Sequence, residues 1–267
     1  MLKAALKAVL HELRLVAVAL QFFTRVPVPA RLGFEPEWLN ASARHFPLVG
    51  FFVGVVGALV LAVGSQALGT AIGVWLSIVA TVWLTGAFHE DGLADTCDAL
   101  GGAVSRERAL EIMKDSRIGS YGAVALVLVL GLKAATLSAL PMVLAVPALL
   151  LAHTASRAAA VLLIRVLPYA GEVSQAKAKP LAQKVSALGV GVALGWVALL
   201  AAALVAARWG WWPYVALSLA GVVLGTVVCG RWFRRRLGGI TGDTLGATQQ
   251  ITEVLALLGW VVALRWT

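Results

Sequence analysis

Residues 71–98 read AIGVWLSIVATVWLTGAFHEDGLADTCD, an apolar stretch that runs directly into a group of acids. The apolar part approaches the length of about 20 mainly apolar residues that a bilayer-crossing helix needs. Asp91, Asp95 and Asp98 stand at i, i+4 and i+7, which places three carboxylates on one helical face. We therefore expect a membrane protein with an acidic site at the mouth of a span.

The composition agrees with a membrane protein. Hydrophobic residues make up 60% of the 267 residues and charged residues only 13%, against roughly 25% charged in soluble domains. Backbone groups in lipid must be paired within their own segment, so the spans are expected to be helices. The sequence predicts an all-α polytopic bundle, one domain over residues 1–267, with about seven spans: 46–63, 71–89, 120–140, 142–166, 185–207, 211–229 and, least securely, 249–266.

The N-terminal segment is expected to lie on the membrane surface. Lys3, Lys7, His11 and Arg14 recur at helical spacing with Leu and Ala between them, the pattern of an interfacial amphipathic helix. Charged residues interrupt its apolar run, so it does not read as a secretory signal.

The net charge of +9 does not indicate nucleic acid, because the basic residues gather in alternate loops. This asymmetry is the positive-inside pattern and predicts a bacterial inner membrane protein whose basic loops and acidic cluster face the cytoplasm. The sequence does not decide the oligomeric state, and a homo-oligomer is one possible state. The basic residues concerned are Arg25, Arg31, Arg44, Arg106, Arg108, Lys114, Arg117, Lys177, Lys179, Lys184, Arg231, Arg234, Arg235 and Arg236.

The acidic cluster is a candidate metal site. Glu90, Asp91, Asp95 and Asp98 would repel one another without a cation, and hard oxygen ligands suit Mg²⁺ or Mn²⁺, which leave room for water and phosphate. The alternative is a solvated helix end with carboxylates favoured by the dipole, but such ends commonly use one or two acids.

Two further segments carry groups that bind phosphate. Lys114, Asp115 and Arg117 mix signs ahead of small residues, and cations of this kind hold phosphate oxygens; the alternative is a charge run that anchors the next span. Residues 237–246 form a glycine-rich approach to the last apolar segment, where Gly242 and Thr244 could offer groups to a phosphate. Asp243 could complete a metal site or orient a hydroxyl.

Polar residues also fall inside the spans, where a charge costs at least about 2.5–3.5 kcal/mol and normally faces the interior. Arg157 is the best candidate for a buried contact to an anion, whereas Lys133 has the alternative of snorkelling to the interface. Glu253 makes the last span the least secure, since its segment also suits a re-entrant or an interfacial helix. Carboxylates, cations and glycine turns on one face suit transfer at phosphorus.

The chain resembles the cobalamin synthase family in the motifs FTRVPVP (23–29), FPLVG (46–50), FHEDGLADTCD (88–98), LEIMKDSRIG (110–119), SR (156–157) and GDTLGA (242–247). The resemblance implies a Mg²⁺-dependent transferase that joins adenosylcobinamide-GDP to α-ribazole, or to its 5′-phosphate, with release of GMP. In that scheme Asp91 and Asp95 bind Mg²⁺, and Asp98 is a third ligand or the base toward the ribazole hydroxyl. Lys114 and Arg117 hold the phosphates, and Asp243 supports metal or nucleophile.

Two other classes stay open at the level of sequence. CDP-alcohol phosphotransferases carry Asp-x-x-Asp-Gly-x-x-Ala-Arg, but Phe88 occupies the place of the first aspartate here, so the match fails. A cation-coupled transporter would place its carboxylates near the midplane between repeated halves, whereas these acids lie at a boundary.

Overall fold

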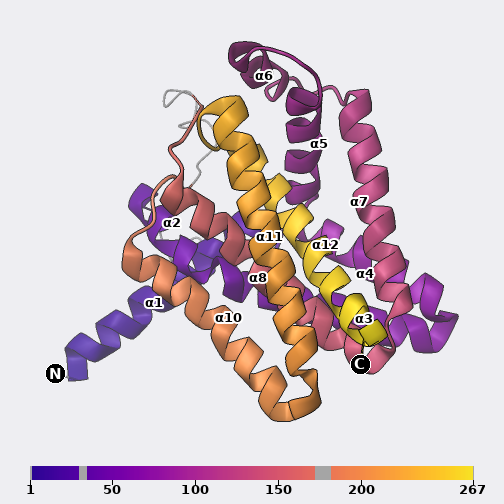
Figure 1. The fold of residues 1–267 in the computed structure, drawn as a ribbon. Coiled ribbons are helices and arrows are strands. Elements are labelled where there is room, and N and C mark those ends of the chain that lie inside the picture. Colours follow the sequence, from indigo (N-terminus) through magenta and orange to yellow (C-terminus); the bar gives the residue numbers. More distant parts are fainter. Residues whose placement is uncertain (1, 30–34, 172–181, 267) are drawn as a thin grey trace.

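The computed structural model describes residues 2–29, 35–171 and 182–266, and within these it is helical with one isolated β-bridge. Figure 1 shows the helices gathered into one bundle, with α6 at one end of it. The elements are α1 (Leu2–Phe23), α2 (Pro36–Ser42), η2 (Ala43–His45), α3 (Phe46–Leu68), α4 (Thr70–Thr85), α5 (Phe88–Gly101), α6 (Arg106–Ile112), α7 (Ser120–Ala139), α8 (Met142–Val166), α10 (Ala187–Ala207), η3 (Trp209–Trp211), α11 (Trp212–Leu237) and α12 (Gly242–Trp266).

The predicted helical membrane bundle is confirmed. Among the described residues, 6 segments are long and apolar enough to cross a membrane, or 7 if the bent pair α4 and α5 counts as one span. The expectation for the last segment is corrected in its length: α12 begins at Gly242 and is a continuous helix of 25 residues. Of the basic residues used for the topology, Arg31, Lys177 and Lys179 lie outside the described residues.

The bundle is built around α8. In the most apolar 18-residue stretch of each helix, 89% is buried inside the protein for α8 and 11% for α10. Helix α8 is therefore the central helix and α10 a peripheral one. Small residues let α3 approach it: a Cβ at Gly50 would lie 2.1 Å from the carbonyl oxygen of His153. Such close backbone approach is typical of helix contacts in membranes, where apolar burial alone does not drive association.

The apolar stretch 71–89 ends sooner than its composition predicts. Helix α4 stops at Thr85, and α5 leaves it at an angle of 89°. Gly86 (φ 67°) and Ala87 (φ 57°) both adopt the left-handed conformation, which an alanine rarely takes. The Ala87 N–H donates to Val82 and closes the end of α4. This break turns the acidic helix away from the direction of the span.

A polar network lies in the interior between α7, α8 and α12. Lys133 is 3% exposed and forms an ion pair of 2.7 Å with Glu253, so it does not snorkel to the interface. His153 lies 2.9 Å from the same carboxylate. Gln250 accepts a hydrogen bond from the Lys133 ammonium at 3.1 Å. The charges that made the last span insecure are therefore paired within the bundle, as intramembrane charges normally are.

Helix α1 is amphipathic, as expected, and is also attached to the bundle. Its C-terminal half buries Leu15 and Phe23, and Glu12 forms an ion pair with Arg44 at 3.1 Å. Leu6 in its N-terminal half and Leu13 near its middle are about three-fifths exposed. This exposed apolar face suits an interfacial helix.

The ion pair between Lys133 and Glu253 generates a stability prediction. Replacing Lys133→Met or Glu253→Gln alone leaves a buried charge without its partner, and we expect each change to destabilise the protein by about 3 kcal/mol. Thermal unfolding in detergent checks this. The double variant should lose less than the sum of the two single variants, because the groups interact directly; strictly additive losses would contradict the pairing.

Candidate active site

The predicted acidic stripe lies on α5. Asp91 is exposed and Asp95 and Asp98 are partly buried on the same face, whereas Glu90 points into the bundle and is 8% exposed. The Glu90 Oε1 accepts a hydrogen bond of 2.9 Å from Gln250, and its Oε2 is buried without a hydrogen-bond partner. Glu90 is thus separated from the other three acids by the direction of its side chain.

The carboxylate of Asp98 holds α5 against α7. Its two oxygens accept hydrogen bonds from the N–H groups of Gly119 (2.7 Å) and Gly122 (2.8 Å) at the start of α7. A carboxylate at a helix N-terminus satisfies donors that have no partner within the helix. Both glycines are required at this contact, because a Cβ at either would lie 2.4 Å from an Asp98 oxygen.

Helices α5 and α12 touch through their backbones. A Cβ at Gly92 would lie 2.8 Å from the carbonyl oxygen of Asp243, and a Cβ at Gly246 would lie 3.2 Å from the carbonyl oxygen of His89. Asp243 therefore stands beside the acidic stripe, although it lies 152 positions after Asp91 in the chain. The glycines allow this approach because any side chain at these positions would separate the two helices.

The N-terminus of α12 is held by its own capping residues and by the segment after α8. The Thr241 N–H donates to the Thr244 hydroxyl at 2.8 Å, and the Thr244 N–H donates to the Thr241 hydroxyl at 3.2 Å. This reciprocal pattern is a capping box. Thr244 is fully buried, so its hydroxyl serves the cap in this structure. Ile240 pairs with Tyr169 in a parallel bridge that fixes the approach to the helix.

Tyr169 is a neighbour of the site that the sequence reasoning missed. Burial raises the pKa of its phenol, and the negative charge of Asp243 raises it further. Tyr169 lies outside the sequence motifs, and its backbone pairing with Ile240 brings it to the start of α12.

The basic segment 113–119 lies across the same end of the bundle. Its first residue, Met113, is buried and its sulfur accepts a hydrogen bond from the Thr241 hydroxyl at 3.6 Å. At its other end, Gly119 is bound by Asp98. Lys114 between them is exposed. Hydrogen bonds and a close backbone contact therefore join the acidic helix, the basic segment and the start of α12.

Asp115 and Arg117 form a local ion pair within this segment. The Arg117 guanidinium donates to both Asp115 oxygens, the shortest at 2.6 Å, and its side chain is 86% exposed. The hydrogen bonds from Arg117 lower the pKa of Asp115 to about 2. Asp115 thus stays ionised at neutral pH, where it orients the arginine.

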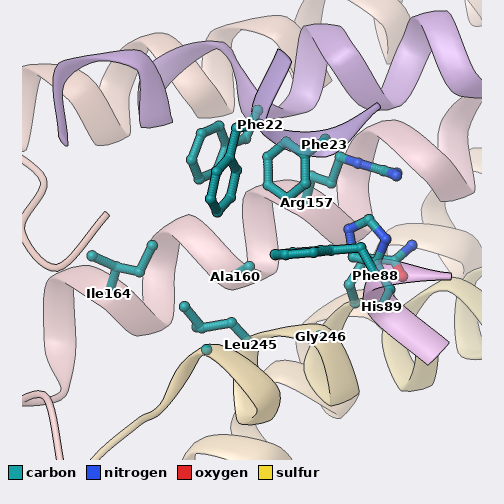
Figure 2. Close-up of a pocket in the computed structure, with 12 residues that line it drawn as sticks. Phe22, Phe23, Phe88, His89, Arg157, Ala160, Ile164, Leu245 and Gly246 are labelled. Carbon is teal, nitrogen blue, oxygen red and sulfur yellow. The ribbon is translucent and has the colours of Figure 1, made fainter. Parts of the chain in front are cut away.

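Arg157 lies deeper than the other predicted residues. It is 2% exposed, donates to the His153 carbonyl oxygen at 3.0 Å, and stands 5.8 Å from the ring centre of Phe23. Figure 2 shows Arg157 and His89 at a pocket bordered by Phe22, Phe23 and Phe88. The carboxylates of Glu90 and Glu253 in the interior attract its positive charge.

Arg236 is a second structural residue that sequence reasoning did not single out. Its guanidinium donates to the carbonyl oxygens of Leu100 and Gly102, each at 2.8 Å, and so caps the end of α5. Capping by a cation is favourable at a helix C-terminus. The run of arginines at 234–236 indicated only topology in the sequence.

The acids offer an incomplete set of metal ligands. Among the described residues, no three His, Cys, Asp or Glu side chains converge as a closed metal site. Asp98 is occupied by α7 and Glu90 by Gln250. Asp91 and Asp95 on α5 and Asp243 at the start of α12 carry hard oxygens of the kind that suit Mg²⁺, because this ion commonly takes one or two carboxylates and completes its shell with water and phosphate.

Comparison with known proteins places the chain in a family. A model of the cobalamin-5-phosphate synthase family matches residues 15–261. The chain belongs to this family. A protein of Leptothrix cholodnii named adenosylcobinamide-GDP ribazoletransferase is 59% identical over 261 residues, which cover 95% of this chain and 97% of that relative. A Vibrio cholerae protein of the same name is 44% identical, with 93% of each chain covered. No solved structure matches.

The contact between α5 and α12 can be tested in this family member by adding one carbon. Gly92→Ala places a Cβ against the Asp243 backbone, and we expect synthase activity to fall on the order of 100-fold because the two motifs move apart. Gly102→Ala is the matched control, since a Cβ there meets nothing within 4 Å. Equal activity of the two variants, each measured on folded protein, would contradict the importance of this contact.

Proposed function

We propose that the protein is an adenosylcobinamide-GDP ribazoletransferase that uses Mg²⁺. The observation that carries the proposal is the meeting of the acidic stripe, the basic segment and the start of α12 at one end of the bundle. Relatives with matching coverage bear this name. A transfer at phosphorus needs what these three segments supply: oxygen ligands for a metal, cations for phosphate, and a carboxylate near the attacking hydroxyl.

Asp91 and Asp95 are the residues that would hold Mg²⁺, with Asp243 facing them from α12. When bound, the ion neutralises charge on the pyrophosphate and on the leaving group. Asp91 is exposed and Asp95 partly exposed, so the remaining coordination positions would go to the substrate and water. The partial set of ligands is what such shared coordination requires.

Lys114 and Arg117 would hold the phosphates of adenosylcobinamide-GDP. Arg117 is already oriented by Asp115 and its exposed guanidinium keeps donors available for an anion. The backbone N–H groups at the start of α12, beginning with Gly242, lie at the positive end of the helix dipole, which favours binding of a phosphate.

In the proposed reaction a ribose hydroxyl of α-ribazole, or of its 5′-phosphate, attacks the phosphorus attached to the cobinamide. A new P–O bond forms, the bond from that phosphorus to the bridging oxygen breaks, and GMP leaves with the bridging oxygen. The hydroxyl proton passes to a carboxylate. We assign this role to Asp243, whose backbone lies against α5 at Gly92; the two Asp98 oxygens accept hydrogen bonds from the start of α7.

The proposed active face is cytoplasmic. The basic segments at 106–117 and 231–236 lie at the same end of the bundle as the acidic stripe, since Arg236 caps α5 and Gly119 binds Asp98. Positive residues accumulate on the cytoplasmic side of bacterial membrane proteins. This face would meet the soluble nucleotide substrates.

The proposal predicts that Asp91→Asn abolishes GMP release, a fall of roughly 100-fold or more, because a metal ligand is lost. Purified protein, Mg²⁺, adenosylcobinamide-GDP and α-ribazole are incubated, and GMP and cobalamin are measured, with EDTA as a metal-free reaction.

Glu107→Gln is the matched control, since Glu107 is an exposed acid on the nearby helix α6. It should retain wild-type turnover. Near-normal turnover of the Asp91 variant would remove Asp91 from the site, and full activity in EDTA would remove the metal from the proposal.

A second prediction concerns the basic segment. Arg117→Ala should raise KM for adenosylcobinamide-GDP about tenfold, because a charged hydrogen bond to phosphate is lost. KM for α-ribazole should change little. Arg108→Ala is the control: Arg108 is an exposed arginine paired with Glu111 at 2.8 Å on α6. A similar rise in both variants would indicate general electrostatics instead of a specific contact.

A further inference from the structure

An aromatic pocket lies at the start of α5, against the first turns of α12. Four phenylalanines border it: Phe22 and Phe23 from the end of α1, Phe46 from α3 and Phe88 from the start of α5. Phe23 packs edge to face on Phe46 and Phe88, with ring centres 4.5 Å and 5.7 Å apart, and Phe22 stacks on Phe46 at 6.0 Å. Carbon atoms therefore make up most of the wall.

Two polar groups at this pocket have buried atoms without partners. Arg157 Nε and His89 Nε2 make no hydrogen bond in the described structure, and the two residues are 2% and 3% exposed. An unpaired buried polar group costs about 1–3 kcal/mol. The Arg157 Nε–H can only donate, so it requires an acceptor. A ligand with one acceptor atom inside an otherwise apolar outline would satisfy it.

The pocket continues into the proposed catalytic groups. Phe88 and His89 directly precede Glu90 and Asp91 on α5, and Gly242 borders the pocket immediately before Asp243. The atoms attached to a flat group held in the pocket would therefore lie near these carboxylates. This is the relation expected between the base of a nucleoside and its reacting sugar hydroxyl.

We propose that the pocket binds the aromatic base of the acceptor α-ribazole, with the Arg157 Nε–H donating to the unsubstituted ring nitrogen. This inference rests on the proposed function and names the acceptor subsite within it. The base of ribazole is a methylated benzimidazole, which has carbon edges and one nitrogen lone pair. Phenylalanine rings offer it edge and face contacts, and Ala160 and Leu245 face its methyl groups.

The guanine of adenosylcobinamide-GDP fits the pocket less well. Its edges carry several donors and acceptors, and a wall made largely of phenylalanine, alanine and leucine would leave most of them unpaired. A lipid chain would leave the Arg157 Nε–H without an acceptor. Phe88 is 39% exposed, so rotation of its ring can admit the base.

The test narrows the pocket and compares two acceptors. Ala160→Leu should weaken binding of α-ribazole roughly tenfold or more while binding of the riboside of unmethylated benzimidazole falls less, because the added carbons compete with the methyl groups. Dissociation constants are measured by calorimetric titration of the purified protein in detergent. Ala203→Leu makes the same change on an exposed position of α10 and should leave both constants unchanged.

Phe88→Leu is a second variant in case Ala160→Leu does not fold; it should weaken both ribosides several-fold by removing a ring face. Weaker binding of adenosylcobinamide-GDP with unchanged α-ribazole would assign the pocket to guanine and overturn the inference, as would unchanged constants for every ligand. Wild-type protein that binds α-ribazole but releases no GMP would contradict the proposed reaction and leave the subsite supported. Wild-type turnover with unaltered α-ribazole binding in both variants would contradict the subsite alone.

Discussion

The backbone contact between α5 and α12 at Gly92 and Gly246 is the constraint on which the arrangement of the candidate site depends. Two helices can come this close only where neither carries a side chain, and here the approach brings Asp243 to the acidic face of α5. The contact also places His89 over the first turns of α12, so that the pocket and the acids share one wall. A wider spacing of α5 and α12 would separate the proposed metal ligands Asp91 and Asp95 from the proposed base Asp243.

Several interactions maintain this contact from outside it. Asp98 fastens α5 to α7, Arg236 caps the end of α5, and Gln250 of α12 donates to Glu90. Deeper in the bundle, the ion pair of Lys133 and Glu253 joins α7 to α12. Buried charges stabilise little by themselves, but they require their partners and so restrict how the helices can pack. Helix α5 is thus bound to α7, α11 and α12.

Much of this protein could be predicted from local pattern. Long apolar runs indicate membrane helices whatever their neighbours, because lipid requires internal pairing of the backbone. The i, i+4, i+7 spacing placed Asp91, Asp95 and Asp98 on one face of a helix, as found. The bend after Thr85 was missed, since nothing in the sequence indicates that Ala87 adopts the left-handed conformation. The pairing of Lys133 was also missed, because Glu253 lies far along the chain.

The sequence by itself determined the membrane class, the helical spans, the family motifs and the spacing of the acids, because these depend on residues close together in the chain. The tertiary structure alone decided which distant groups bind the individual acids of the motif. Glu90 and Asp98 belong to the same motif as Asp91, yet one is bound by Gln250 and the other by the start of α7. It also brought Phe23, Phe88 and Arg157 to one pocket. The physical reason is that side-chain partners come from distant helices, and only packing sets which of them meet.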